Sequence, residues 1–379
     1  MKRTILFRVA VLTLCAAALA AAYQAAKTEA LMYESATLLV QSLNRLQKAS
    51  TLFKFDAKHR MDWHYFPETG FTDEYGYVRN GITFKDMDPK QAHFANALLG
   101  SGLSQAGFVK AAKVMALERI VGVIEDDYTG YRDPRRFHFS IFGEPSLTGT
   151  WGWRVEGHHL SLHYTIKDGE LVSSSPTFFG ANPHQVAQGP HKGFRVLARE
   201  EDLAVELMSA FTEDQRKQVI FTGIAPYDIV TMADKRAKIE GKPQGLPSSK
   251  MNDKQYEILL GLIAEYANNL PSGVAAARMK AAEGTPRDQL FFAWAGRLDR
   301  PDPKPVPIGG RTTGNREKNG NYYRIQSPKF LIEYDNTQNL SNHSHSAWRE
   351  FDNDYGLDVL AQHYNIHDHT GGEHVALAD

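Results

Sequence analysis

Three histidines and a glutamate gather in the stretch EGHHLSLHY, which spans residues 156–164. Neutral imidazole nitrogens and carboxylate oxygens are ligands for Zn²⁺ and for other divalent transition metals. Aromatic and β-branched residues flank the stretch, so we expect residues 151–166 to form one strand whose side chains alternate between two faces. On such a strand Glu156 and His158 share a face, where a carboxylate and an imidazole can bind one metal ion.

His159 and His163 lie on the opposite face of the expected strand. Four residues along a flat strand span about 13 Å, so these two imidazoles cannot bind one ion unless the strand contains a bulge. Each histidine of the stretch can instead be a half-exposed sheet residue that makes ordinary hydrogen bonds. We therefore expect at most two of these histidines to belong to one site.

A second pair of histidines, His343 and His345, occurs in the polar segment NLSNHSHSAWR. Histidines separated by one residue can both face inward from an extended segment, as in His-x-His metal sites. One or both of them, added to Glu156 and His158, would complete a shell of three or four ligands that leaves room for a water or a substrate. In the alternative, the neighbouring asparagine and serines cap a following helix, and the two histidines are surface polar groups.

Arg349, Asp352 and Asp354 follow these histidines, within a helix that we expect to run from about Ser346 to Tyr364. On that helix Asp352 can pair with Arg349, which is a structural ion pair in most proteins. A catalytic role would have Arg349 bind a substrate carboxylate through two parallel hydrogen bonds. The candidate catalytic residues are therefore Glu156, His159, Arg349 and Asp354.

The composition is that of an ordinary globular protein, with 42% hydrophobic and 23% charged residues among 379. The formal net charge of -1 provides no basic surface of the kind that binds nucleic acid phosphates or an anionic membrane. We therefore expect no nucleic acid and no membrane partner, but a small-molecule substrate of unknown identity. The sequence does not indicate an oligomeric state.

Residues 1–22 have the pattern of a cleaved secretory signal, with basic residues before an apolar run that ends in small residues. The apolar run of about 14 residues is shorter than the ~20 that a membrane-spanning helix needs, so a retained anchor is the alternative. Cleavage would remove Cys15, the only cysteine, and a metal ion in the mature chain must then be bound by nitrogen and oxygen. We expect a periplasmic or secreted protein.

The elements that would hold these residues follow the order helices, strands, helices, strands and a final helix. An amphipathic pattern from Thr28 to Ala49 and the capping residues Asp88 and Ser104 predict the first helices. The apolar period then changes from 3.6 to 2, and the pair Asp168–Gly169 predicts a tight hairpin turn. We expect one α+β domain over residues 23–379, with a central antiparallel meander that the later strands join.

Several longer segments resemble a known family: RFHFSIFGEP, WGWRVEGHHLSLHYTI, PTFFGANP, FLIEYDNTQ and HSHSAWREFDNDYGLDVLAQHY. Together they are similar to the bacterial family of domain of unknown function 3500, over roughly residues 90–365. That family has no established activity, so the resemblance implies relatedness and little chemistry. It implies that the two histidine clusters form one site. His163 lies outside the family pattern, and the matching positions are Gly157, His158, His159, His345, Arg349, Asp354 and Gly356.

These observations predict an exported metal-dependent enzyme, with hydrolytic rather than oxidative chemistry. Zinc is the expected ion, with iron or copper as the alternatives, and its ligands are drawn from Glu156, His158, His159, His343 and His345. A metal would lower the pKa of a bound water, and Glu156 or an unligated histidine would move the proton. Two other classes stay open: a non-catalytic secreted protein that binds a metal or another ligand, and a metal-free enzyme that uses histidine and glutamate directly.

Overall fold

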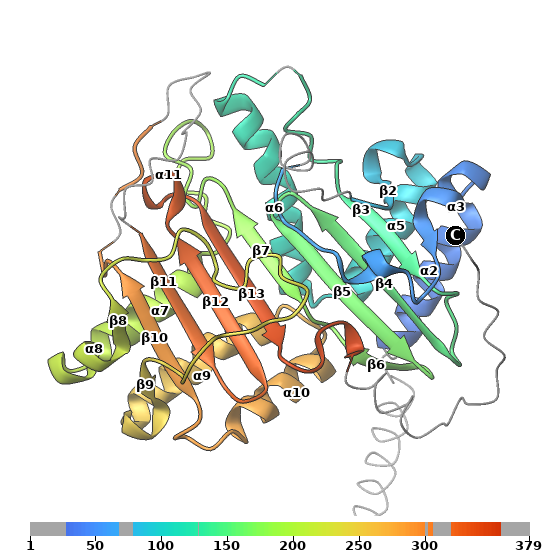
Figure 1. The fold of residues 1–379 in the computed structure, drawn as a ribbon. Helices are drawn as coiled ribbons and strands as arrows, with labels where there is room; N and C mark the ends of the chain where they lie inside the picture. Colours follow the sequence, from blue (N-terminus) through green and yellow to red (C-terminus); the bar gives the residue numbers. More distant parts are fainter. Residues whose placement is uncertain (1–27, 68–78, 128, 300–301, 306–319, 358–379) are drawn as a thin grey trace, which may run out of the picture.

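A computed structural model describes residues 28–67, 79–127, 129–299, 302–305 and 320–357 of the chain (Figure 1). The predicted signal peptide, residues 1–22, lies outside these ranges. Within them, no helix is both long enough and apolar enough to cross a lipid bilayer.

One mixed, mostly antiparallel sheet forms the centre of the described structure (Figure 1). Its strands are β1 (Leu52–Phe53), β2 (Ile82–Thr83), β3 (His138–Phe142), β4 (Thr150–Gly157), β5 (Leu160–Lys167), β6 (Glu170–Ser173), β7 (Thr177–Ala181), β8 (Ile220–Thr222), β9 (Leu246–Pro247), β10 (Phe291–Gly296), β11 (Asn321–Gln326), β12 (Phe330–Asn336) and β13 (Ser344–Glu350). Along the main path the order is β1, β3, β4, β5, β7, β13, β12, β11, β10 and β8. The late strands thus join the meander, and the prediction of an α+β fold with a central antiparallel sheet is confirmed.

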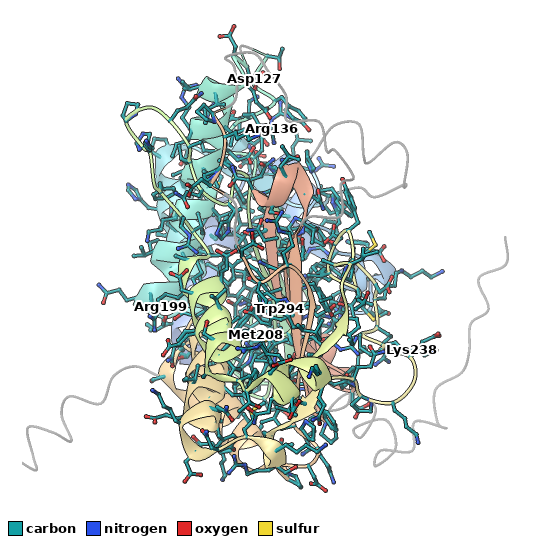
Figure 2. All side chains as sticks on the ribbon, turned by 90° about the vertical axis from the view of Figure 1, so that its left-hand side faces the viewer. Asp127, Arg136, Arg199, Met208, Lys238 and Trp294 are labelled. Atoms are coloured by element: carbon teal, nitrogen blue, oxygen red, sulfur yellow. The ribbon has the colours of Figure 1, made fainter. Side chains whose placement is uncertain are left out.

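The longer helices pack on one face of this sheet, while irregular segments cross the other face (Figure 1). Figure 2 shows the arrangement edge-on, with Arg199 of the helix face and Lys238 of the opposite face on different sides. The helices are α2 (Thr28–Ser42), α3 (Arg45–Thr51), α5 (Pro89–Ser101), α6 (Gln105–Ile124), α7 (Ala198–Ala210), α8 (Glu213–Val219), α9 (Asp253–Ala267), α10 (Ser272–Glu283) and α11 (Gln338–Ser341), with single 3₁₀ turns η1 (Lys58–Met61), η2 (Phe84–Asp86), η3 (Ser248–Lys250) and η4 (Asp354–Gly356).

Side-chain caps fix the starts of two predicted helices. Asp88 accepts a hydrogen bond of 2.8 Å from the backbone N–H of Gln91, whose side chain in turn accepts one from the backbone of Asp88. Ser104 accepts a hydrogen bond of 3.0 Å from the N–H of Gly107, at the start of α6. Because each cap binds an N–H that has no partner within its own helix, both helices begin where the sequence predicts.

Strand β7 joins the two halves of the sheet and brings distant segments together. One edge of β7 pairs with β5, where Phe179 lies opposite Leu160, and the other edge pairs with β13, where Gly180 lies opposite His345. The segment that precedes β5 and the segment that forms β13 therefore lie on either side of one short strand. This register places the two histidine-rich stretches next to each other.

Residues 151–166 do not form one strand, so this part of the prediction was wrong. They form a hairpin of β4 and β5, in which Gly157 pairs with Leu160 and the turn consists of His158 and His159. His159 adopts a left-handed backbone conformation, with φ of 64°. The turn lacks the Asn-Gly or Asp-Gly signal that usually marks a two-residue loop, so the alternating pattern was read as continuous. The next turn, Asp168–Gly169, lies where the sequence predicts it.

The predicted helix from Ser346 is also wrong over its first part, because residues 344–350 form strand β13. This strand pairs along its whole length with β12, where Asp335 lies opposite His345, and its other edge pairs with β7. Both edges of its backbone are thus hydrogen-bonded within the sheet, and this tertiary pairing overrides the local helical pattern. The end of the predicted helix, from residue 358 onward, lies outside the described residues.

Candidate metal centre

Three imidazole nitrogens meet between the β4–β5 turn and the start of β13. The Nε2 atom of His343 lies 2.8 Å from Nε2 of His159 and 3.1 Å from Nε2 of His345. A single lone pair on the nitrogen of His343 cannot make two good hydrogen bonds at once. One ion with Zn–N distances of about 2.0–2.1 Å would satisfy all three nitrogens, so the donor set fits a metal.

The backbone around His159 fixes the position of its ring. Its N–H donates a hydrogen bond of 3.0 Å to the carbonyl of Tyr65, and its carbonyl accepts one of 2.8 Å from the N–H of Gly180. Gly180 has no Cβ, and the imidazole occupies that space: an added Cβ would lie 2.6 Å from Cδ2 of His159. The N–H of His343 donates a hydrogen bond of 3.1 Å to Oδ1 of Asn336.

If the three histidines bind zinc, a Gly180→Ala variant is expected to bind it more weakly by roughly tenfold or more, the range seen when the support of a ligand is lost. The new methyl group displaces the His159 ring without removing any ligand. Competition with a chromophoric chelator measures this loss. Gly261→Ala is the control, because a Cβ at Gly261 meets open space, and equal affinities of the two variants would contradict the assigned position of His159.

Two carboxylates hold the far side of the His345 ring. Nδ1 of His345 lies 2.9 Å from Oδ1 of Asp228 and 3.0 Å from Oδ1 of Asp335. Tyr65 donates a hydrogen bond of 2.9 Å to Asp228, and Thr337 donates one of 3.0 Å to Asp335. Nδ1–H therefore faces the carboxylates and Nε2 faces the other imidazoles, which is the orientation of a carboxylate–histidine–metal arrangement.

Neither of these aspartates was predicted from the sequence to belong to the site. A signal existed for Asp335, because it lies directly opposite His345 in the pairing of β12 and β13. Asp228 belongs to an irregular segment that Glu333 fixes to the sheet: the Glu333 carboxylate accepts hydrogen bonds from the N–H groups of Val230 and Thr231, at 2.7 and 3.2 Å. No residue pattern reveals that a segment more than a hundred residues away supplies this carboxylate.

Two of the three histidines, His159 and His343, are already in the neutral form that binds a metal ion, whereas His345 is protonated. Burial lowers the pKa of His159 well below 6.5, and neighbouring imidazoles act in the same direction. Burial also lowers the pKa of His343 well below 6.5, so both rings are neutral near pH 7. Burial opposes protonation of His345 as well, but Asp228 and Asp335 outweigh it and raise the pKa of His345 to about 10. A metal must therefore displace a proton from His345, and its affinity rises with pH.

His158 belongs to a neighbouring charged network rather than to the meeting point of the three nitrogens. Its ring stacks on His159 with centroids 3.8 Å apart, and its Nδ1 bonds the Glu118 carboxylate. Glu118, His158 and His159 could themselves hold an ion. However, Nη1 of Arg132 lies 3.2 Å from Nδ1 of His158, and Nε of Arg132 binds Glu125 at 2.8 Å. This buried guanidinium disfavours a second cation by charge repulsion.

Glu156 does not join the imidazoles, which corrects the predicted ligand pair of Glu156 and His158. Its carboxylate accepts a hydrogen bond of 2.6 Å from the backbone of His64 and lies 3.0 Å from Nε of Arg154. Burial alone would raise the pKa of Glu156, but Arg154 and other neighbouring groups outweigh it and lower the pKa. Glu156 is separated from the imidazoles because the turn at residues 158–159 takes His158 and His159 away from the strand face on which Glu156 lies. His163 is also apart, with its Nε2 3.0 Å from Oγ of Ser161.

Arg349 and Asp354 form a buried ion pair, not an open clamp for a substrate. Nε of Arg349 lies 2.7 Å from Oδ2 of Asp354, and both side chains are 0% exposed. Nη2 of Arg349 donates a hydrogen bond of 2.8 Å to the carbonyl of Asp234. The predicted helical pair with Asp352 does not form, because residues 344–350 are a strand and the chain then turns to bring Asp354 back.

Residues 25–357 match the family described as protein of unknown function, DUF3500, and the chain belongs to that family. The match extends the resemblance seen in the sequence toward the N-terminus and includes all the residues of the candidate metal centre. No curated protein and no solved structure matches the chain at a significant level.

Proposed function

We propose that this family member is an exported hydrolase that depends on one divalent metal ion, bound by His159, His343 and His345. The observation that carries the proposal is the meeting of three Nε2 atoms at 2.8 and 3.1 Å. Three imidazoles are a ligand set of catalytic zinc, which keeps its fourth position for water. The set lacks the carboxylate ligand of the non-haem iron triad, and so favours zinc over iron. Bound zinc supplies hydroxide near neutral pH by lowering the pKa of its water.

The other residues of the centre have supporting roles in this proposal. Asp228 and Asp335 hold His345 with Nε2 toward the metal, at distances of 2.9 and 3.0 Å from Nδ1. His158, stacked on His159 and bonded to Glu118, is the candidate for moving a proton. It replaces Glu156 in that role, because the Glu156 carboxylate is bound by Arg154 and the backbone of His64. Export rests on the signal pattern of residues 1–22.

A second candidate is a non-catalytic protein that retains a metal. The burial of His159 and His345, which are 3% and 2% exposed, favours it, because a closed site releases a metal slowly. The two candidates share the ligand set and differ only in whether the metal activates a reaction. They are therefore separated by activity and not by metal content.

Hydrolysis of a panel of nitrophenyl esters, phosphates and glycosides by the mature protein tests the proposal. We expect activity that a chelator removes and that zinc restores, and that His343→Ala lacks. His163→Gln is the control, since His163 is a buried histidine of the same sheet that bonds Ser161 and lies outside the three-histidine cluster. If the protein retains zinc through the three histidines yet hydrolyses nothing in the panel, the non-catalytic candidate is favoured. Activity that survives both chelation and His343→Ala contradicts the proposal.

An Asp335→Asn variant is expected to bind zinc roughly 10- to 100-fold more weakly, as with other carboxylates that orient a metal-bound histidine. The substitution removes the negative charge next to Nδ1 of His345 but keeps the shape of the side chain. Competition titration against a fluorescent chelator measures the change. Asp352→Asn is the control, because Asp352 is exposed and lies outside the centre. An unchanged affinity of Asp335→Asn would remove this aspartate from the centre.

A further inference from the structure

A cavity of about 720 Å³ opens on the helix face of the sheet, away from the histidines. Trp348 of β13 lines this cavity. His345 precedes Trp348 by three residues on the same strand, so its side chain faces the opposite side of the sheet. A volume of this size is typical of small-molecule sites. The lining combines residues of α2, β6, α10 and the ends of β12 and β13, among them Leu171, Val274, Arg278 and Phe330.

The lining includes a buried positive charge without an ion-pair partner among the described residues. Arg278 is 4% exposed, and its Nη2 donates hydrogen bonds only to neutral groups of Ser174 and Thr177. Its Nε and Nη1 have no hydrogen-bond partner, and its guanidinium lies 4.3 Å from the centre of the Trp348 ring. Glu350, which also lines the cavity, and Asp354 attract this guanidinium from beyond ion-pair distance and leave its Nε and Nη1 unpaired. Buried donors without an acceptor are costly, so a ligand carboxylate on Arg278 would be favoured.

The rest of the lining indicates what the remainder of such a ligand would be. Leu171, Val274 and Phe330 supply apolar surface that can bury a hydrocarbon body. Glu170 and Asp352 are exposed carboxylates on the same cavity. The lining thus combines a buried cation with apolar surface, one exposed cation, Lys329, and four carboxylates, those of Glu29, Glu170, Glu350 and Asp352. Both signs of charge beside apolar surface are complementary to a zwitterion.

We propose that this cavity binds a small amphipathic zwitterion, with its carboxylate toward Arg278, its apolar body on Leu171 and Phe330, and its ammonium group near Glu170 and Asp352. The site is separate from the metal centre and does not depend on the proposed hydrolysis. Its chemistry is that of an ω-amino acid or of a short peptide with separated charged ends. Binding would add a partner for the guanidinium nitrogens that the protein alone leaves unpaired.

Saturation-transfer NMR of the mature protein with 6-aminohexanoate, hexanoate and hexylamine tests the proposal. We expect 6-aminohexanoate to bind best, because only this compound offers both charges. We expect hexylamine to bind worst, because it lacks the carboxylate that Arg278 would bind. Arg278→Gln should weaken 6-aminohexanoate binding roughly 10- to 100-fold, the equivalent of losing one charged hydrogen bond. Ala277→Trp should block binding by filling the cavity from an exposed position on α10.

Ala276→Trp is the matched control, because Ala276 is exposed on the same helix but does not line the cavity. Should Arg278→Gln fail to fold, the comparison of the two tryptophan variants decides the question alone. The proposal is overturned if 6-aminohexanoate does not bind the wild type, or if Ala277→Trp binds it as well as Ala276→Trp does. Equal binding of hexylamine and 6-aminohexanoate would also overturn the proposal, because the ligand carboxylate would then make no contribution through Arg278.

Discussion

An Arg349→Leu variant will lose about 3–5 kcal/mol of the free energy of unfolding, because it leaves a buried carboxylate without its counter-ion. The Asp354 carboxylate loses its bond of 2.7 Å to Arg349 and keeps only a hydrogen bond of 2.9 Å from the N–H of Glu350 and one from Ser175. The pair joins the end of β13 to the turn η4, so its loss also loosens that turn. Urea denaturation of the two metal-free proteins measures the difference.

The double variant Arg349→Leu/Asp354→Leu distinguishes a structural pair from a substrate clamp. We expect it to be more stable than Arg349→Leu alone, since no unpaired charge is left in the interior. A clamp for a substrate carboxylate would behave differently. In that case Arg349→Leu would keep the stability of the wild type and raise the KM for an anionic substrate, and the assignment made here would be wrong.

Acid will destabilise the metal-free protein steeply below pH 6.5. Burial lowers the pKa of His159, His163 and His343 well below 6.5, so these rings stay neutral in the fold and take up protons on unfolding. Each contributes a loss of about 1.4 kcal/mol per pH unit as the pH falls. Asp335 acts in the opposite direction, because burial raises its pKa to about 6 and it gains a proton in the fold.

His64 acts in the same direction as these three histidines, because burial lowers its pKa to about 4. The histidines therefore outweigh Asp335, and the free energy of unfolding falls as the pH falls from 6.5 toward 4. His345 acts in the opposite direction near pH 6.5, because its pKa of about 10 keeps it protonated in the fold while the unfolded ring, with its ordinary pKa of 6.5, gains a proton only as the pH falls. Well below pH 6.5 it is protonated in both states and adds no slope. Urea midpoints of the chelator-treated protein at several pH values measure the slope. His163→Gln should reduce it by one proton and leave the metal centre intact. A stability that stays constant from pH 6.5 to pH 5 would contradict these protonation states.

The parts of the fold that the sequence predicts are those set by local chemistry. Asp88 and Ser104 cap their helices where a side-chain oxygen precedes free N–H groups, and Asp168–Gly169 forms a turn that needs left-handed backbone. Residues 346–350 were predicted to begin a helix but belong to strand β13, because that strand depends on pairing with β7 and β12, which local sequence does not encode.

The residues of the candidate site also fall into those that the sequence predicts and those that depend on tertiary contacts. The sequence singles out His159, His343 and His345 as metal-capable residues, and their segments meet because β7 pairs with both halves of the sheet. The predicted position of Glu156 was wrong, because an alternating pattern does not reveal a two-residue turn between β4, which contains Glu156, and the start of β5. Asp228 was missed, since it comes from an irregular segment that only tertiary contacts bring to His345.

X-ray absorption spectroscopy of the zinc-loaded mature protein, with its metal stoichiometry, tests most directly whether three imidazoles form one metal centre. We expect one zinc ion per chain, with three imidazole nitrogens at about 2.0–2.1 Å. We expect His343→Ala to lose at least one of these imidazoles from the spectrum or to lose the zinc altogether, while His163→Gln keeps the wild-type spectrum. A protein that retains no zinc after reconstitution, or a spectrum that is the same with and without His343, would contradict the account.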